Sequence, residues 1–430
     1  MDFRAFLQNN RVYLDGGTGT LLQQAGLSSG ELPERWNVTH ADVIEGLHKA
    51  YFDAGSNVVA ANTFGANTIK FPENELSLVI AAAIRNAKRA AVVSSGMQEK
   101  FVALDIGPTG KLLKPYGTLD FDDAVEIFAK TVRIGAQNGA DLILIETMSD
   151  CYEMKAAVLA AKENCDLPIL VSNAYESNGK LMTGASPKVL TAMLEGLGVD
   201  GFGANCSLGP QKLQPVVETL LDLASLPVLV KPNAGLPVTE NGVTRYDVDA
   251  ETFAEQMQVF AKAGARILGG CCGTTPTYIK ALVEKTSCLP LPTMEEKQAA
   301  YVSSYIRAID PKTASVGTAV NVPKDAHMRQ AVQDGDWDAV IDEAFDQKAE
   351  GVDVLYINVD GAGAENALSQ CMESLQEVID LPLLMESNDL PALERAMRRY
   401  NGTPYIRLAS GQTKADVLPL LQKYGGVLAE

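Results

Sequence analysis

The sequence predicts an α/β protein: a (β/α)8 TIM barrel followed by a smaller, incomplete β/α barrel-like domain. Short runs rich in Val, Ile and Leu alternate with longer amphipathic segments along the chain. Continuously apolar strands that alternate with helices are typical of a parallel sheet covered on both faces. Eight such runs before residue 275 match a barrel of about 250 residues. The alternative is a doubly wound open sheet, but the glycines of LDGGTGT lack its G-x-G-x-x-G spacing.

Each predicted strand of the barrel is an apolar run that ends in Gly, Asn, Asp or Cys. The helical patterns between them include ADVIEGLHKAYFDAG from Ala41 and FDDAVEIFAKTVRIGAQNGA from Phe121, and several end in a Gly suited to a helix C-terminus. In order, the eight runs are VYLDGG from Val12, NVVAANTF from Asn57, FVALDIG from Phe101, DLILIET from Asp141, PILVSNAY from Pro168, GFGANCS from Gly201, PVLVKPNAG from Pro227 and ARILGGCCG from Ala265.

Length and composition indicate a globular protein of two domains. The chain has 430 residues, of which 47% are apolar and 21% charged. Because its net charge is -18, we do not expect nucleic acid as a ligand. The N-terminus MDFRAFLQNN lacks the apolar core of a signal peptide, and no run reaches the roughly 20 apolar residues that span a membrane. We therefore expect a cytoplasmic protein without membrane contact, whose seven cysteines are buried thiols, metal ligands or nucleophiles rather than disulfides.

Polar and thiol side chains follow the predicted strands, at the end of a barrel where chemistry collects. Three cysteines come from strands six and eight, which lie close together in the barrel wall. The three histidines, in contrast, lie at no strand end, so a nucleophile triad based on His is not expected. The strand-end residues are Asp15, Asn62, Thr63, Asp105, Glu146, Ser172, Asn173, Asn205, Cys206, Lys231, Asn233, Cys271 and Cys272.

Three converging thiolates without a fourth protein ligand are typical of a catalytic zinc site. Cys271 and Cys272 share one metal ion only if the backbone turns beside them, and the glycines of GGCCG permit such a turn. A zinc ion here is better suited to binding and ionising an incoming thiol than a water molecule. The alternative is that the cysteines are buried small hydrophobic residues.

The strand-end motifs closely resemble the homocysteine S-methyltransferase domain over residues 1 to about 290. They are LDGGTGT, ANTFGAN, DIGPTGKLLKPYG, LIETMSD, VSNAYESNGKLMTG, GANCSLGP, VKPNAGLP and GGCCGTTP. The GPTGKLLKP segment is most similar to the cobalamin-dependent methionine synthase branch of that family. The resemblance implies a zinc-bearing barrel, residues 1–290, that binds homocysteine as a thiolate through zinc held by Cys206, Cys271 and Cys272.

The same resemblance implies which residues hold the amino acid part of the substrate. Asp15 and Glu146 would face its ammonium, while Gly16, Asn62 and Thr63 would help to hold its carboxylate. Buried carboxylates and loop N–H groups have the complementary charges for this. In the alternatives, Asp15 caps the following turn and Glu146 pairs with Lys231.

The sequence after residue 290 predicts a linker, residues 291–314, and a partial β/α domain, residues 315–430. This domain resembles the N-terminal half of the pterin-binding barrel of cobalamin-dependent methionine synthase. Its five predicted strands are SVGTAVNV, VDVLYINV, PLLMES, TPYIRLAS and GGVLAE. Asn358 matches that family. Glu386 and Arg407 stand where the family has Asp and Asn, and these two differences weigh against binding of methyltetrahydrofolate. Because a half barrel leaves unpaired sheet edges, we expect it to pack on the first barrel or to form a homo-oligomer.

We therefore expect zinc-dependent methyl transfer to the thiolate of homocysteine, giving methionine. The chain lacks the D-x-H-x-x-G pattern of a cobalamin-binding module, so the donor is expected to be methylcobalamin on a separate corrinoid protein. One alternative is a small onium donor such as S-methylmethionine or betaine, which an aromatic cage would favour, with Phe64, Tyr116 and Tyr175 as candidates. The other is a catalytically silent subunit of a methyltransferase assembly.

Overall fold

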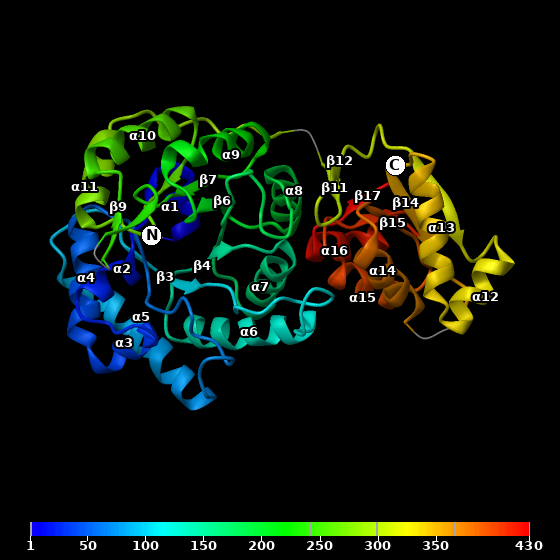
Figure 1. Cartoon of the computed structure of the whole chain (residues 1–430), viewed down its shortest axis with the longest axis horizontal. Helices are drawn as coiled ribbons and strands as arrows, with labels where there is room; N and C mark the ends of the chain where they lie inside the picture. The colour runs from blue at the N-terminus through cyan, green and yellow to red at the C-terminus, as the bar shows by residue number, and fades with distance from the viewer. Residues whose placement is uncertain (1, 241–242, 298–299, 364–365, 430) are drawn as a thin grey trace. The chain divides into compact units, whose positions relative to one another are not determined.

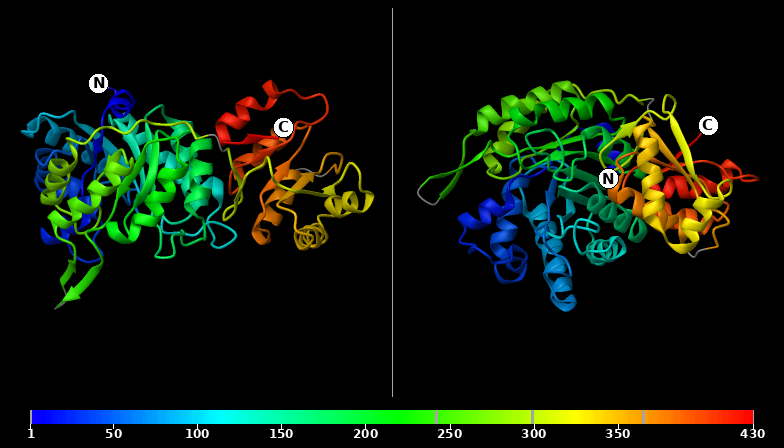
Figure 2. Two further views of the ribbon diagram at one scale, coloured as in Figure 1. Left: turned by 90° about the horizontal axis from the view of Figure 1, so that it is seen from above. Right: turned by 45° about the vertical axis from the view of Figure 1, so that its right-hand side comes forward.

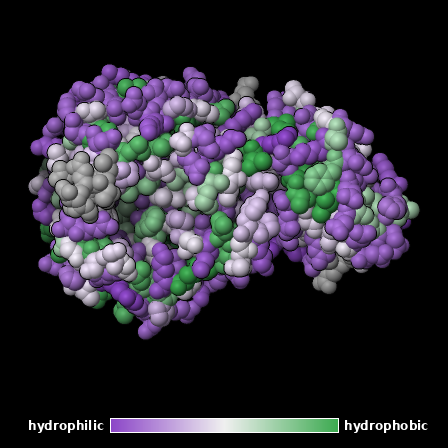
Figure 3. Space-filling model, in the orientation of Figure 1, coloured by the Kyte–Doolittle hydropathy of each residue, from purple (hydrophilic) through white to green (hydrophobic). Residues whose placement is uncertain are grey.

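The structure is a computed structural model that describes residues 2–240, 243–297, 300–363 and 366–429. It consists of two compact units (Figure 1). The first unit comprises Met1–Met182 and Val199–Glu296, and the second comprises Thr183–Gly198 and Lys297–Glu430. Hydrophilic residues cover much of the face shown in Figure 3, with hydrophobic residues scattered among them. No helix among the described residues is long and apolar enough to cross a membrane.

The first unit contains all eight predicted strands in one parallel sheet, in the order β1-β10-β7-β6-β5-β4-β3-β2. Asn57 joins the two end strands, since its backbone N–H donates to Tyr13 O at 2.7 Å and its Oδ1 accepts from Tyr13 N at 3.0 Å. The sheet is thus a nearly closed barrel, which confirms the predicted fold. The strands are β1 Val12–Tyr13, β2 Val58–Ala60, β3 Phe101–Ile106, β4 Leu142–Met148, β5 Ile169–Asn173, β6 Gly201–Asn205, β7 Val228–Lys231 and β10 Ile267–Leu268.

Helices alternate with these strands and begin at well-formed caps. The side chains of Asp120, Asp150 and Asp249 accept hydrogen bonds from the first turns of α6, α7 and α10. Prolines start α9 and α11, where a missing N–H has no cost. The helices of the unit are α1 Phe3–Asn9, α2 Thr18–Gln24, η1 Pro33–Arg35, α3 Trp36–Thr39, α4 Ala41–Asp53, α5 Glu73–Val93, α6 Phe121–Gln137, α7 Cys151–Asn164, α9 Pro210–Leu223, α10 Ala250–Ala263 and α11 Pro276–Thr286. A hairpin of β8 Pro237–Glu240 and β9 Val243–Tyr246 projects from the unit (Figure 2).

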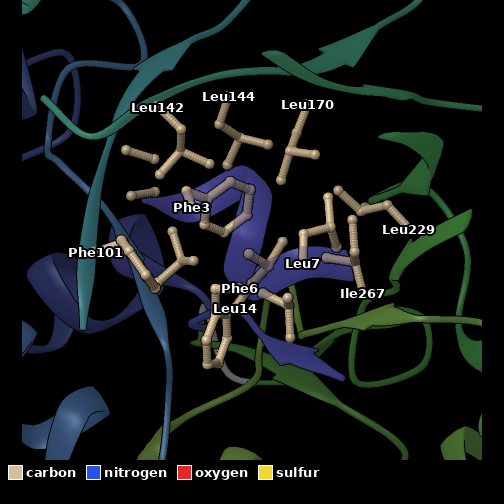
Figure 4. Packing of buried hydrophobic residues seen from close by; sticks show 14 residues of the cluster. Phe3, Phe6, Leu7, Leu14, Phe101, Leu142, Leu144, Leu170, Leu229 and Ile267 are labelled. Atoms are coloured by element: carbon tan, nitrogen blue, oxygen red, sulfur yellow. The ribbon is translucent and has the colours of Figure 1, made fainter. Parts of the chain in front are cut away.

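Helix α1 fills the barrel at the amino ends of the strands. Phe3, Phe6 and Leu7 point among the inward side chains of the strands, and the Phe3 ring meets that of Phe101 edge-on at 5.2 Å between centroids (Figure 4). Inward residues recur every second position along a strand. Beyond the apolar Phe101 and Ala103 the next inward residue of β3 is Asp105, and beyond Leu142 and Leu144 that of β4 is Glu146. The interior is therefore apolar at one end and polar at the other.

The second unit contains the five predicted strands as one parallel sheet in chain order: β13 Val316–Asn321, β14 Val354–Asn358, β15 Leu383–Met385, β16 Tyr405–Ile406 and β17 Val427–Leu428. On one face of this sheet, a small core is formed by Val354, Tyr356, Leu384 and Tyr405 of the strands together with Val302. Residues 302–309, within the segment expected as a linker, contain the antiparallel pair β11 Val302–Ser303 and β12 Ala308–Ile309. The helices of the second unit are α8 Pro187–Leu197, α12 Ala326–Asp334, α13 Trp337–Ala349, α14 Ala367–Val378, α15 Leu390–Arg399 and α16 Lys414–Tyr424.

Candidate active site

A pocket of about 310 Å³ lies at the carboxyl ends of the barrel strands. Six of the eight predicted site residues line it: Gly16, Asn62, Glu146, Cys206, Cys271 and Cys272. The other two, Asp15 and Thr63, are buried and are not part of its lining. The Thr63 hydroxyl donates to Asp105 O at 2.8 Å and accepts from Asp105 N at 3.1 Å, so it joins the ends of β2 and β3.

The three predicted cysteine ligands form one cluster. Their sulfur atoms lie within 4.8 Å of one another, and Cys206 Sγ is 3.9 Å from Cys272 Sγ. The predicted turn beside Cys271 and Cys272 is confirmed, because Thr274 N donates to Cys271 O at 3.1 Å and Gly273 has a φ of 80°. A side chain at Gly273 would also collide with the Tyr246 ring, since its Cβ would lie 2.3 Å from that ring. Glycine is therefore required here for backbone conformation and for space.

The sulfur cluster fits a zinc ion. Two sulfur ligands of one tetrahedral zinc ion, each about 2.3 Å from the metal, lie about 3.8 Å apart. The pair formed by Cys206 and Cys272 already has this spacing. Hydrogen bonds from the thiols of Cys206 and Cys271 lower the pKa of Cys272, so the cluster releases its first proton more readily than an isolated thiol would. The cluster therefore presents negative charge and soft donors to a cation.

A buried ion cluster lies beside the sulfur atoms. Lys231 Nζ is 2.7 Å from Glu146 Oε2 and 3.7 Å from Asp15 Oδ1, so the pairing considered as an alternative for Glu146 is present. Asp15 also accepts from Ala60 N at 2.8 Å. Asp105 lines the pocket, and its Oδ1 has no hydrogen-bond partner among the described residues. Three carboxyl groups thus face a single ammonium.

Burial sets the protonation of these groups. Loss of hydration raises the pKa of Asp15 to about 7 and raises the pKa values of Asp105 and Glu146 as well. Burial alone would lower the pKa of Lys231, but the carboxylates of Glu146 and Asp15 outweigh that effect and raise it. The cluster therefore keeps its lysine charged and has spare acceptors for a second ammonium.

Asn205 ties the strand ends of β4, β5 and β6 together behind the sulfur cluster. Its Oδ1 accepts from Thr147 N and from Ser172 Oγ, both at 2.8 Å. Its Nδ2 donates to Thr147 Oγ1 at 2.7 Å and lies 4.0 Å from Cys271 Sγ. These bonds hold Thr147 in the left-handed region, at a φ of 65°, which is rare for a β-branched residue.

Several residues of the pocket wall were not predicted as site residues, and among them are Glu34, Phe64, Lys70 and Thr147. Phe64 was considered only as a candidate for an aromatic cage. Glu34 and Lys70 come from segments outside the predicted strands, so no strand-end rule applies to them. Glu34 is buried, and its Oε1 accepts from Gly65 N at 2.6 Å. A positive φ at Thr147 has no signature in LIETM, because its cause, Asn205, is 58 residues away along the chain.

Comparison with known proteins identifies the class. Residues 12–286 match the family model of homocysteine S-methyltransferase, and the chain belongs to this family. The chain is 30% identical over 421 residues to the methionine synthase of Mycobacterium leprae, and 29% identical over 418 residues to that of Mycobacterium tuberculosis. Each alignment covers 90% of this chain but 34% of the relative, so the chain spans about a third of the length of these relatives.

A solved structure resembles about two thirds of the chain. The homocysteine methyltransferase MmuM from Escherichia coli, in its oxidized form, superimposes with a TM-score of 0.57 and 23% sequence identity. The match covers 66% of this chain and 99% of that protein. Its metallated form gives a TM-score of 0.56 at the same identity. These structures share the barrel fold.

Proposed function

We propose that this protein transfers a methyl group to the thiol sulfur of homocysteine and thereby forms methionine, with zinc held by Cys206, Cys271 and Cys272. The observation that carries the proposal is the position of the three sulfur atoms, which share one pocket with a buried cluster rich in carboxylates. A ligand for that pocket needs a thiol at one end and an ammonium at the other. Homocysteine has both, and the family of the chain agrees with this choice.

Each part of the pocket has a role in this proposal. A bound zinc ion would supply the chemistry that ionises a thiol near neutral pH. Glu146 and Asp105 line the pocket and accept hydrogen bonds from the substrate ammonium. Asp15 is not part of the pocket wall and acts indirectly, by pairing with Lys231. Gly16 and Asn62 lie on the wall where the substrate carboxylate would be held, and Thr63 supports that wall.

The chemical step is a direct displacement. The thiolate sulfur of homocysteine forms a bond to the methyl carbon as the bond between that carbon and the donor breaks, and the bonding electrons leave with the donor. The pocket aligns the sulfur with the methyl group, and such alignment can lower the activation barrier by about 7 to 11 kcal/mol. No covalent enzyme intermediate is needed.

We propose methylcobalamin, carried by a separate corrinoid protein, as the donor. Of the three aromatic residues considered for an onium cage, only Phe64 lines the pocket. Tyr175 is fully buried elsewhere in the barrel, and Tyr116 is 56% exposed and is not part of the pocket wall. A cage that holds an onium methyl group needs several aromatic faces around one point, and the described pocket wall offers one.

The test is methionine formation by the zinc-loaded protein with homocysteine and, in separate reactions, methylcobalamin or S-methylmethionine. We expect turnover with methylcobalamin, and we expect Cys272→Ser to lose both zinc and activity. Cys288→Ser is the matched control, because Cys288 is an exposed free thiol outside the pocket. Turnover with S-methylmethionine alone would contradict the proposal that methylcobalamin is the donor. A protein that binds zinc but transfers no methyl group from either donor or from a methylated corrinoid protein would support the silent-subunit alternative.

A further inference from the structure

The second unit has a pocket of its own that the proposed methyl transfer does not use. It encloses about 500 Å³ at the carboxyl ends of β13 to β16. The carboxyl ends of parallel strands are where β/α sheets usually bind ligands. Asn321, Asn358, Glu386 and Arg407 line this pocket at the ends of four neighbouring strands. The rest of the described lining is Thr318, Pro323, Lys324, Asp325 and Tyr356.

Strand register places these four residues in one layer. Asn321 is paired with Asn358, and the pairs Ile357 with Met385 and Met385 with Ile406 bring Glu386 beside Asn358 and Arg407 beside Glu386. Side chains at one level of neighbouring parallel strands point to the same face, and the strands are about 4.8 Å apart. Two positions earlier in their strands, the apolar core residues Tyr356, Leu384 and Tyr405 form the floor beneath this polar layer.

Arg407 provides an unpaired cation in this layer. Its guanidinium carbon lies 4.9 Å from the centroid of the Tyr356 ring, and this contact orients the side chain. Within the described part of the chain, the guanidinium has no hydrogen-bond or ion-pair partner. Its five N–H donors form a planar fork that matches a carboxylate or a phosphate group. The pocket therefore favours a ligand with an oxyanion.

Glu386 provides the opposite charge one strand away. Its Oε2 accepts from the Tyr356 hydroxyl at 3.1 Å and its Oε1 accepts from Asn358 Nδ2 at 3.3 Å. Both donors are neutral, and no cation pairs with this carboxylate among the residues that the structure describes. A carboxylate has about four acceptor positions, so two remain for a ligand. Glu386 and Arg407 thus stand side by side without pairing with each other.

We propose that this pocket binds a free α-amino acid as a zwitterion. Arg407 would hold its carboxylate and Glu386 its ammonium, and the carboxamides of Asn321 and Asn358 would complete the hydrogen bonds of these two groups. An α-amino acid carries its two charged groups on one carbon, which suits opposite charges on adjacent strands. The ligand completes both charges at once, whereas a simple anion leaves Glu386 unpaired.

The test is isothermal titration calorimetry of the full chain with glycine, methionine and glutamate. The analogues are methioninamide, which lacks the carboxylate, and 4-methylthiobutyrate, which lacks the ammonium. We expect at least one amino acid to bind, and we expect Arg407→Gln and Glu386→Gln each to weaken that binding by about tenfold or more. Both analogues should bind correspondingly more weakly than methionine if methionine is the ligand.

Arg395→Gln is the matched control, because Arg395 is an exposed arginine on α15 of the same unit. It should bind as the unaltered protein does, and far-UV circular dichroism of all three variants shows whether they fold. The proposal is overturned if none of the three amino acids binds, or if the folded Arg407→Gln variant binds them unchanged. Binding of phosphate or methyltetrahydrofolate without any amino acid would also overturn it. An isotherm that is sensitive to Glu146→Gln but not to Arg407→Gln would assign binding to the barrel pocket and count against the proposal.

Discussion

Cys271 and Cys272 are neighbours in the chain, yet both sulfur atoms reach one corner of the pocket because the backbone turns between Cys271 and Thr274. The run GGCCG predicts this turn, since glycine removes the steric limits on backbone conformation. The position of Cys206 also follows from the sequence, because it comes at the end of a predicted strand. The supporting bonds of Asn205 could not be predicted, since they depend on the relative rotation of three strand ends.

Asn205 should control how firmly the sulfur cluster is held. In Asn205→Ala, Thr147 loses the bonds that hold its positive φ, and Cys271 loses a neighbouring N–H group. We expect zinc affinity, measured by competition with a chelator, to fall by about 10- to 100-fold. Ser172→Ala is the graded control, because it removes one hydrogen bond to Asn205 and leaves the contacts with Thr147. Unchanged zinc affinity in folded Asn205→Ala would show that the network is not needed for the metal site.

His48 should make the stability of the first unit sensitive to acid. It is fully buried in α4, neither ring nitrogen has a hydrogen-bond partner among the described residues, and burial lowers its pKa to about 4. Because the unfolded chain binds the proton more tightly, near its ordinary pKa of about 6.5, stability is fully present above that pH and falls as the pH drops toward 4. The loss attributable to His48 is about 3 kcal/mol.

The measurement for His48 is the free energy of unfolding at a series of pH values between 4 and 8, for the unaltered protein and for His48→Leu. The difference between the two isolates the histidine from the buried carboxyl groups, which titrate in both. We expect the difference to change by about 3 kcal/mol across this range. Parallel pH profiles of the two proteins would mean that His48 is not buried in its neutral form.

At the scale of elements, the strands were the most predictable part of the chain. All eight strands of the barrel and all five of the second unit appear where continuous apolar runs predicted them. Parallel strands are buried on both faces, so their sequence signal is strong. The hairpin of β8 and β9 and the pair of β11 and β12 were not predicted. Strands of two to four residues outside the main sheets carry too short an apolar pattern to stand out.

Helix α1 should stabilise the barrel without taking part in the site. Phe3 is 1% exposed and packs on Phe101 at the amino ends of the strands, away from the sulfur cluster. We expect Phe3→Ala to lower the free energy of unfolding by about 3 to 5 kcal/mol in chemical denaturation, with unchanged zinc content. Phe345→Ala, at a position 44% exposed, should cost less than about 0.5 kcal/mol. A loss below about 1 kcal/mol for Phe3→Ala would show that the helix is not a structural plug.

At the scale of the whole molecule, the two units share one arrangement of apolar and polar side chains along their strands. In each, inward apolar side chains form a floor and polar side chains follow at the carboxyl ends of parallel strands. The two pockets differ in chemistry, because the first contains three thiols and the second contains an arginine and a glutamate that have no ion-pair partner among the residues the structure describes. This difference is why we assign methyl transfer to the first unit and amino acid binding to the second.

We propose above all that the three cysteines hold a zinc ion that receives the thiol of homocysteine. X-ray absorption at the zinc edge is the measurement, taken on residues 1–430 before and after addition of homocysteine. We expect three sulfur ligands from Cys206, Cys271 and Cys272 before addition and a fourth sulfur ligand afterwards. Fewer than three sulfur ligands, or a zinc environment that homocysteine leaves unchanged, would contradict it.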